Sequence, residues 1–133
     1  MSFGVDTSVL VRLLVGEPAS LVAAVRERLL AAFRSAEPVQ ASDVVIAEAY
    51  YALKYHYESD PAAIRAALFS MLTSGLVQPE SGSAVLAVLA AKAGGKSGFV
   101  DRLIQSRYER AGLTTLTMDR AQSRLGRSEL IGK

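Results

Sequence analysis

Short β-prone runs alternate with longer amphipathic runs along the chain, and this alternation is the strongest constraint on the fold. The β-prone runs cover residues 3–5, 38–41, 76–79, 113–118 and 129–131. The helical patterns between them cover residues 9–14, 19–36, 44–57, 61–74, 82–93, 99–112 and 121–125. Strands separated by helices are typical of an α/β protein with a parallel sheet. At 133 residues we expect a single domain spanning residues 1–133.

An aspartate stands where the first strand meets the first helix. Phe3–Val5 is short and apolar, and Asp6 follows it directly. In open parallel sheets, ligands bind at the carboxyl edge of the strands, so Asp6 is a candidate functional residue. The structural alternative is that Asp6, Thr7 or Ser8 only caps the next helix, which is worth about 1 kcal/mol. We expect Thr7 or Ser8 to cap this helix and Asp6 to serve the chemistry.

A second strand repeats this pattern near the C-terminus. The β-prone run 113–118 contains Thr117 and ends at Asp119. A short basic helix is predicted over residues 121–125. A second carboxylate is therefore expected at the same edge of the sheet.

Two further acids stand among apolar residues of predicted helices. Glu48 has apolar neighbours at helical spacing on both sides, namely Val44, Val45, Tyr51, Ala52 and Tyr55. Asp101 precedes Ile104 and Tyr108 by three and seven residues. A carboxylate on a buried face must pair with an arginine, stay protonated or bind a metal. For Asp101 the alternative is stabilisation of the helix N-terminus.

Four carboxylates brought together repel one another unless a cation joins them. Hard divalent cations fit best, because Mg²⁺ binds oxygen ligands and often joins carboxylates to substrate phosphates. The chemistry that follows is phosphodiester hydrolysis by a metal-activated water. Thr7, Ser8 and Thr117 could orient the water or bind phosphate, or could equally be helix-cap or strand hydroxyls.

Four motifs in this order and spacing resemble the PIN domain. They are Val5-Asp6-Thr7-Ser8-Val9-Leu10, Val44-Val45-Ile46-Ala47-Glu48-Ala49-Tyr50-Tyr51-Ala52-Leu53, Asp101-Arg102-Leu103-Ile104 and Thr117-Met118-Asp119-Arg120. The size of the chain is similar to the VapC toxins of bacterial toxin–antitoxin pairs. The resemblance implies an α/β/α sandwich around a short parallel sheet, and a Mg²⁺- or Mn²⁺-dependent endoribonuclease that forms a homodimer. It also implies inhibition by an antitoxin, and Asp6, Glu48, Asp101 and Asp119 as the metal-binding acids, with Ser8 and Thr117 beside them.

The chain departs from this pattern at two positions. Many relatives carry further acids where this sequence has Gly98 and Ala121. We therefore expect one Mg²⁺, with any second ion dependent on RNA. Antitoxins of this family often present an arginine to the acidic pocket, where a guanidinium can form bidentate bonds with carboxylates.

Composition excludes several other kinds of chemistry. Cysteine is absent and His56 is the single histidine, so disulfides, thiolate zinc sites and cysteine nucleophiles are excluded. No apolar run is long enough for a membrane span, and we expect a cytoplasmic protein. The segment Gly94–Gly98 lacks the spacing of a phosphate-binding loop, because Ala91 stands where that loop needs glycine.

Charge is distributed unevenly along the chain. Residues 92–133 hold nine Lys/Arg and four Asp/Glu, a net charge of +5, whereas residues 1–91 have a net charge of −3. The basic third could attract RNA or an acidic partner, or could be no more than solvated helix faces. The tyrosines between positions 50 and 57 could pack in the core, form a dimer face or stack on bases.

Two other functions remain open from the residues. One is an RNA- or protein-binding module that no longer cuts. The other is a phosphohydrolase with Asp6 as nucleophile, which is weaker because such enzymes usually have an acid two residues on, where this chain has Ser8.

Overall fold

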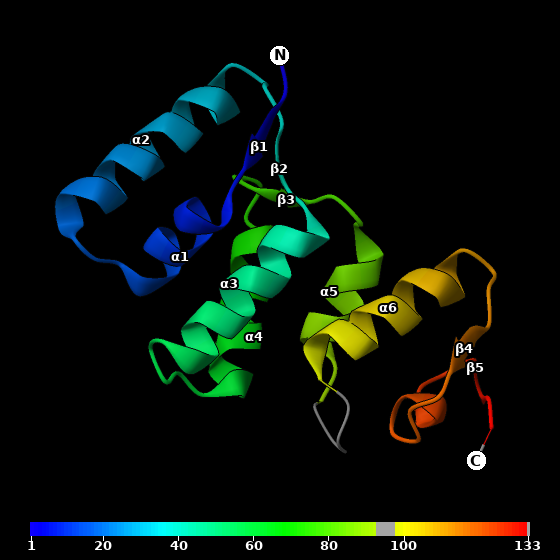
Figure 1. Cartoon of the computed structure of the whole chain (residues 1–133). Coiled ribbons are helices and arrows are strands. Elements are labelled where there is room, and N and C mark those ends of the chain that lie inside the picture. Colours follow the sequence, from blue (N-terminus) through cyan, green and yellow to red (C-terminus); the bar gives the residue numbers. More distant parts are fainter. Residues whose placement is uncertain (93–97, 133) are drawn as a thin grey trace. The chain divides into compact units, whose positions relative to one another are not determined.

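The computed structural model describes residues 1–92 and 98–132 (Figure 1). In chain order the elements are β1 (Phe3–Val5), α1 (Thr7–Val15), α2 (Ala19–Arg34), β2 (Val39–Ala41), α3 (Asp43–Tyr55), α4 (Pro61–Leu72), β3 (Gln78–Pro79), α5 (Ser83–Ala90), α6 (Phe99–Arg110), β4 (Thr115–Thr117), the 3-10 helix η1 (Gln122–Arg124) and β5 (Ser128–Leu130). Every predicted strand and helix is present, and the α/β class with short parallel sheets is confirmed. The predictions for the segment at 93–97 lie outside the described residues.

The chain forms two compact units, Met1–Gly82 and Ser83–Lys133. The first contains a three-stranded sheet in the order β1-β2-β3, and the second contains the pair β4-β5. All of these pairings are parallel. The single domain expected over residues 1–133 stays a prediction.

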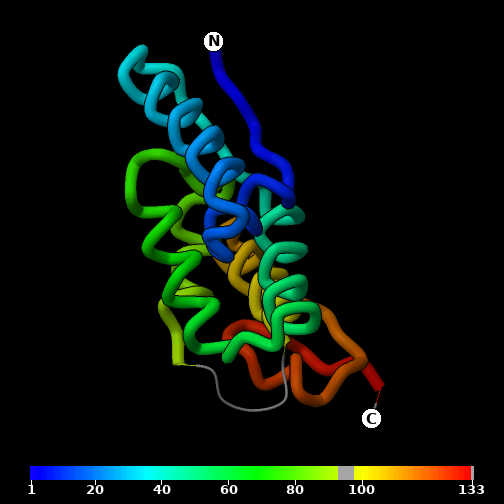
Figure 2. The backbone as a smooth tube through the Cα atoms, turned by 90° about the vertical axis from the view of Figure 1, so that its left-hand side faces the viewer, coloured from blue at the N-terminus to red at the C-terminus, as the bar shows by residue number. Residues whose placement is uncertain are grey.

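The sheet of the first unit is covered by α2 on one face. Phe3 is in register with Val39 and Val5 with Ala41, so these four side chains share a face, and Val39 and Ala41 are buried. The α2 helix lies alongside β1 (Figure 2), and the guanidinium carbon of its Arg28 lies 4.8 Å from the centroid of the Phe3 ring. The apolar alternation of β2 therefore matches a sheet with one buried face.

Helix ends in the first unit follow local capping chemistry. Ser42 caps α3 by accepting a hydrogen bond from the Val45 N–H at 3.2 Å, and Asp60 caps α4 through the Ala63 N–H at 3.2 Å, with Pro61 at the first helical position. Gly16 ends α1 with φ of 78°, a left-handed conformation that favours glycine. Each of these helix ends is therefore fixed by residues close to it in the sequence.

The second unit is built on the packing of α5 against α6. A buried Ser106 hydroxyl in α6 donates to the Ala84 carbonyl of α5 at 2.8 Å. The pair β4-β5 places Thr117 beside Leu130, and Ser128 and Leu130 flank the exposed Glu129. The helix predicted from residue 82 begins at Ser83, and the Ser81 hydroxyl before it donates to Asp43 Oδ1 at 2.7 Å.

The buried faces of α3 and α6 differ from those predicted. In α3 the buried side chains are Ile46, Ala49, Tyr50 and Leu53, and Glu48 is exposed on the opposite face. In α6 the buried side chains are Phe99, Leu103 and Ser106, whereas Val100, Ile104 and Tyr108 are 37–45% exposed. Both helices have apolar residues on two faces, and periodicity alone could not identify the buried one.

Within the described residues, no single helix is long and apolar enough to cross a membrane; α1 and α2 reach that length and apolar composition only when taken together, and the two are bent by 118°.

Candidate functional site

Asp6 lies directly after β1 and is the N-cap of α1. Its Oδ1 accepts hydrogen bonds from the Ser8 N–H at 3.0 Å, the Ser8 hydroxyl at 2.5 Å and the Val9 N–H at 3.4 Å. The expectation that Thr7 or Ser8 would cap this helix is wrong, because α1 begins at Thr7 and the preceding side chain takes the capping position.

The same contacts set the ionisation of Asp6. The Ser8 hydroxyl, and after it the Val9 N–H, lower the pKa of the Asp6 carboxyl below its ordinary value of 3.8. Asp6 is exposed, and no described residue donates to its Oδ2. One carboxylate oxygen therefore caps the helix, while the other is not used by any described donor.

Glu48 is joined to the residue after Asp6. The Thr7 hydroxyl donates to Glu48 Oε1 at 3.2 Å, which connects the start of α1 to the middle of α3. These two helices pack against each other. The prediction that Glu48 lies buried in the apolar stripe is wrong, but its predicted proximity to the Asp6 segment is found. An exposed carboxylate needs no buried arginine, so burial no longer argues for a cation at Glu48.

Asp119 repeats the arrangement of Asp6. It follows β4, its Oδ1 accepts the Gln122 N–H at 2.9 Å, and its own N–H donates to the Thr117 hydroxyl at 3.0 Å. Asp119 is exposed. Thr7, Ser8 and Thr117, predicted to position water or phosphate, thus each contact one of the acids.

Asp101 lies in the first turn of α6 and is half-buried. Its carbonyl accepts a hydrogen bond from the side-chain amide of Gln122 at 3.1 Å, and no described residue donates to its carboxylate. Gln122 is 7% exposed and contacts both Asp101 and Asp119. The sequence gave no signal for this glutamine, because a single polar residue in a short basic segment has no distinctive spacing.

The structure thus connects the predicted acids in two pairs, each through an intermediate residue. Thr7 links Asp6 to Glu48 in the first unit, and Gln122 links Asp101 to Asp119 in the second. Within each unit's described residues, no group of three His, Cys, Asp or Glu residues could hold a metal ion. Each pair alone offers two carboxylates.

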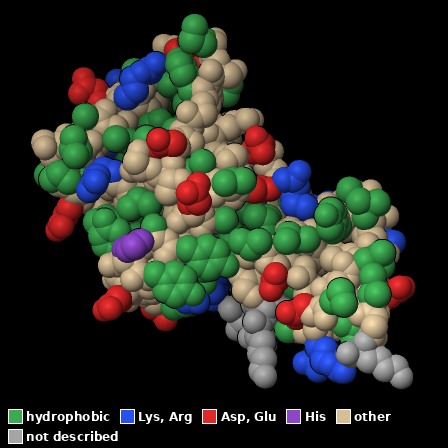
Figure 3. Space-filling model, in the orientation of Figure 1, with side chains coloured by type: hydrophobic (Ala, Val, Ile, Leu, Met, Phe, Trp, Pro, Cys, Tyr) green, Lys and Arg blue, Asp and Glu red, His purple; other side chains and the backbone are tan. Residues whose placement is uncertain are grey.

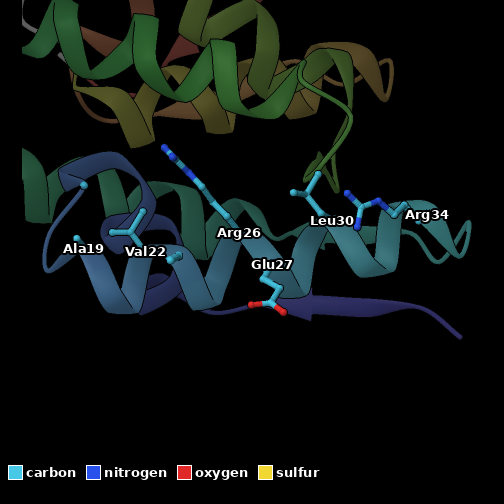
Figure 4. Close-up of a pocket in the computed structure, with 8 residues that line it drawn as sticks. Ala19, Val22, Arg26, Glu27, Leu30 and Arg34 are labelled. Carbon is cyan, nitrogen blue, oxygen red and sulfur yellow. The ribbon is translucent and has the colours of Figure 1, made fainter.

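The first unit also has a hollow whose lining differs from the acid pairs described above. It has a volume of about 570 Å³ and lies along α2, with Arg26, Leu30 and Arg34 on one side of the helix and Glu27 on another (Figure 4). Two arginines and one glutamate are a poor ligand set for a divalent cation. The sole histidine, His56, is exposed at the end of α3.

Comparison with known families bears on the function of these acids. The family model described as PIN domain matches residues 4–128. The chain belongs to the PIN domain family. The match includes all four acids and extends through both units. No curated protein matches the chain. PIN domains are a superfamily of nucleases often found in toxin–antitoxin systems, so this PIN domain is assigned to hydrolases acting on nucleic acid.

PIN domains typically use divalent metal ions, and the donor chemistry of this chain fits one. All four candidate ligands are carboxylates, the oxygen donors that Mg²⁺ prefers, and Asp6, Glu48 and Asp119 are exposed. Asp6 and Asp119 each use Oδ1 for a backbone contact, which fixes the side chain while the second oxygen stays available.

Proposed function

We propose that this protein is a Mg²⁺-dependent endoribonuclease, with Mn²⁺ as a possible substitute. The observation that carries the proposal is the arrangement of the two strand-end aspartates, each fixed through one carboxylate oxygen only. Such a side chain is pre-oriented without its second oxygen being used. The family match supports nuclease chemistry, and the absence of catalytic cysteine and histidine pairs is in keeping with it.

In this proposal Asp6, Glu48, Asp101 and Asp119 hold the metal. Bound Mg²⁺ supplies positive charge that stabilises the transition state of phosphodiester hydrolysis and acidifies water. Ser8 keeps Asp6 in its charged form, Thr7 orients Glu48, and Gln122 fixes the segment carrying Asp119. Preorganisation of this kind places the ligands without reorganisation during the reaction.

The proposed biological role is that of a toxin held inactive by a cognate antitoxin. PIN domains often occur in such pairs, and an arginine of the partner would compete with the cation for carboxylates. We further propose that the protein forms a homodimer. We also propose a cytoplasmic location, with which a cysteine-free sequence is in keeping.

The test is RNA cleavage by purified protein with Mg²⁺ or Mn²⁺ and with EDTA. Cleavage is expected with either metal and should stop with EDTA. Asp6→Asn, Glu48→Gln and Asp101→Asn should each lower the rate by about 100-fold or more. Asn caps helices about as well as Asp, so Asp6→Asn removes the charge while keeping the cap.

Asp60→Asn is the matched control, because Asp60 caps α4 in the same manner but belongs to neither acid pair. It should cleave RNA like the wild type. Undiminished cleavage by all three acid variants would refute the site.

A second candidate is a PIN-type binding module that does not cut. It is favoured by Gly98 and Ala121, which stand where many relatives carry further acids. Such a module would bind RNA or a protein partner equally well with Mg²⁺ and with EDTA.

A further inference from the structure

A stacked aromatic pair, the exposed Tyr55 and the half-buried Tyr51, lies on the same face of α3 as Glu48. Tyr51 and Tyr55 follow Glu48 by three and seven residues, which places all three on one side of the helix. The two rings are stacked, with centroids 6.0 Å apart and planes 10° from parallel. Tyr55 is 65% exposed, and Val44 on the same face is 69% exposed. Hydrophobic side chains gather over this part of the first unit in Figure 3.

A cation accompanies the aromatic pair. The Lys54 Nζ lies 5.2 Å from the centroid of the Tyr55 ring. Aromatic rings beside a flexible lysine are the combination by which proteins bind single-stranded nucleic acid, with bases stacking on the rings and phosphates meeting the cation. Seven helical residues span about 10 Å, so Tyr55 is within a few nucleotides' reach of Glu48.

Building on the proposed function, we propose that Tyr55, supported by Tyr51, stacks on an unpaired base of the RNA near the bond that is cut. Lys54 contacts a phosphate of the same strand. The substrate class that follows is RNA with splayed, single-stranded bases, because paired bases do not offer their faces for stacking.

A second copy of this chain is the other occupant to consider for this face. A two-fold interface uses the same surface on both chains. Burying this face would therefore place the Glu48 carboxylates of both copies in a desolvated contact, which is costly without cations. A metal-binding Glu48 must also remain accessible to substrate. Both arguments favour RNA over a second copy.

The test is binding of a fluorescent, mixed-sequence single-stranded RNA of about 12 nucleotides in EDTA, where cleavage is blocked. Tyr55→Ala should weaken binding by about 5- to 100-fold, whereas Tyr55→Phe should stay within about twofold of wild type. Tyr57→Ala is the matched control: Tyr57 is 48% exposed but lies beyond the end of α3.

Two further measurements compare Tyr55→Ala with the wild type. One is the affinity for duplex RNA of the same sequence, and the other is the oligomeric state. Tyr55→Ala should bind duplex RNA like the wild type and keep its oligomeric state. The proposal is overturned if Tyr55→Ala binds single-stranded RNA as tightly as the wild type does, or if it loses as much affinity for duplex RNA as for single strands. It is also overturned if the substitution dissociates a dimer, because this face would then belong to the contact with a second copy. Failure of the wild type to bind or cut any RNA would instead overturn the proposed function.

Discussion

The Asp6 side chain combines two roles through its two oxygens. Oδ1 receives the Ser8 and Val9 hydrogen bonds that start α1, and no described residue donates to Oδ2. The competing interpretations of the sequence, a helix cap or a chemical group, are therefore compatible in one residue. Because the Ser8 hydroxyl is the largest cause of the lowered pKa, Ser8 determines how readily Asp6 is protonated.

Ser8→Ala should raise the pKa of Asp6 toward its ordinary value of 3.8. The folded-state pKa lies below the unfolded one, so the contribution of Asp6 to stability is present above about pH 3.8 and is lost as the pH falls through the folded pKa. An NMR titration of the Asp6 carboxyl carbon in both proteins measures the change. An identical titration curve in Ser8→Ala would show that the hydroxyl does not hold the carboxylate.

At the scale of the elements, Gln122 connects η1 to α6. Gln122→Leu keeps the side-chain volume but removes the hydrogen bond to the Asp101 carbonyl. A cost of about 1 kcal/mol in the free energy of unfolding is expected, measurable by urea denaturation. The control is Gln105→Leu, since Gln105 lies on α6 and, among the described residues, its amide donates only to Glu109 of the same helix. Equal stability of the two variants would contradict the role given to Gln122.

The existence and order of the elements followed from the sequence, but the orientation of two helices did not. Strands ending at Asp6 and near Asp119 were readable because β-prone runs stop at polar turn residues. The buried face of α3 could not be predicted, because the helix has apolar residues on opposite sides. Val44 and Tyr55 lie opposite Ile46, and only Ile46 is buried. Which apolar face is buried depends on the neighbouring helices, and this information is not local.

The acids of the candidate site could be listed from sequence, but not their local partners. Motif order pointed to Asp6, Glu48, Asp101 and Asp119. The Thr7 contact to Glu48 joins residues 41 positions apart. Such contacts depend on helix packing, so a sequence pattern can nominate the hydroxyls but cannot assign each to its acid.

At the scale of the whole molecule, the basic C-terminal third is suited to a polyanion. Arg120 and Arg124 are exposed, and Arg120→Gln/Arg124→Gln should weaken single-stranded RNA binding. Losing two phosphate contacts should reduce the slope of log affinity against log salt by about 1.4. Fluorescence anisotropy over a salt series checks this. Arg26→Gln/Arg34→Gln is the control pair, and an equal change in slope for both pairs would show only a general effect of charge.

The central claim is that Asp6 binds a divalent cation, and metal titration tests it most directly. Calorimetry with Mg²⁺ and Mn²⁺ should find one ion per chain in the wild type and in Asp60→Asn. Asp6→Asn, which keeps the helix cap, should weaken binding at least about tenfold. Metal binding by Asp6→Asn as tight as by the wild type would contradict the account.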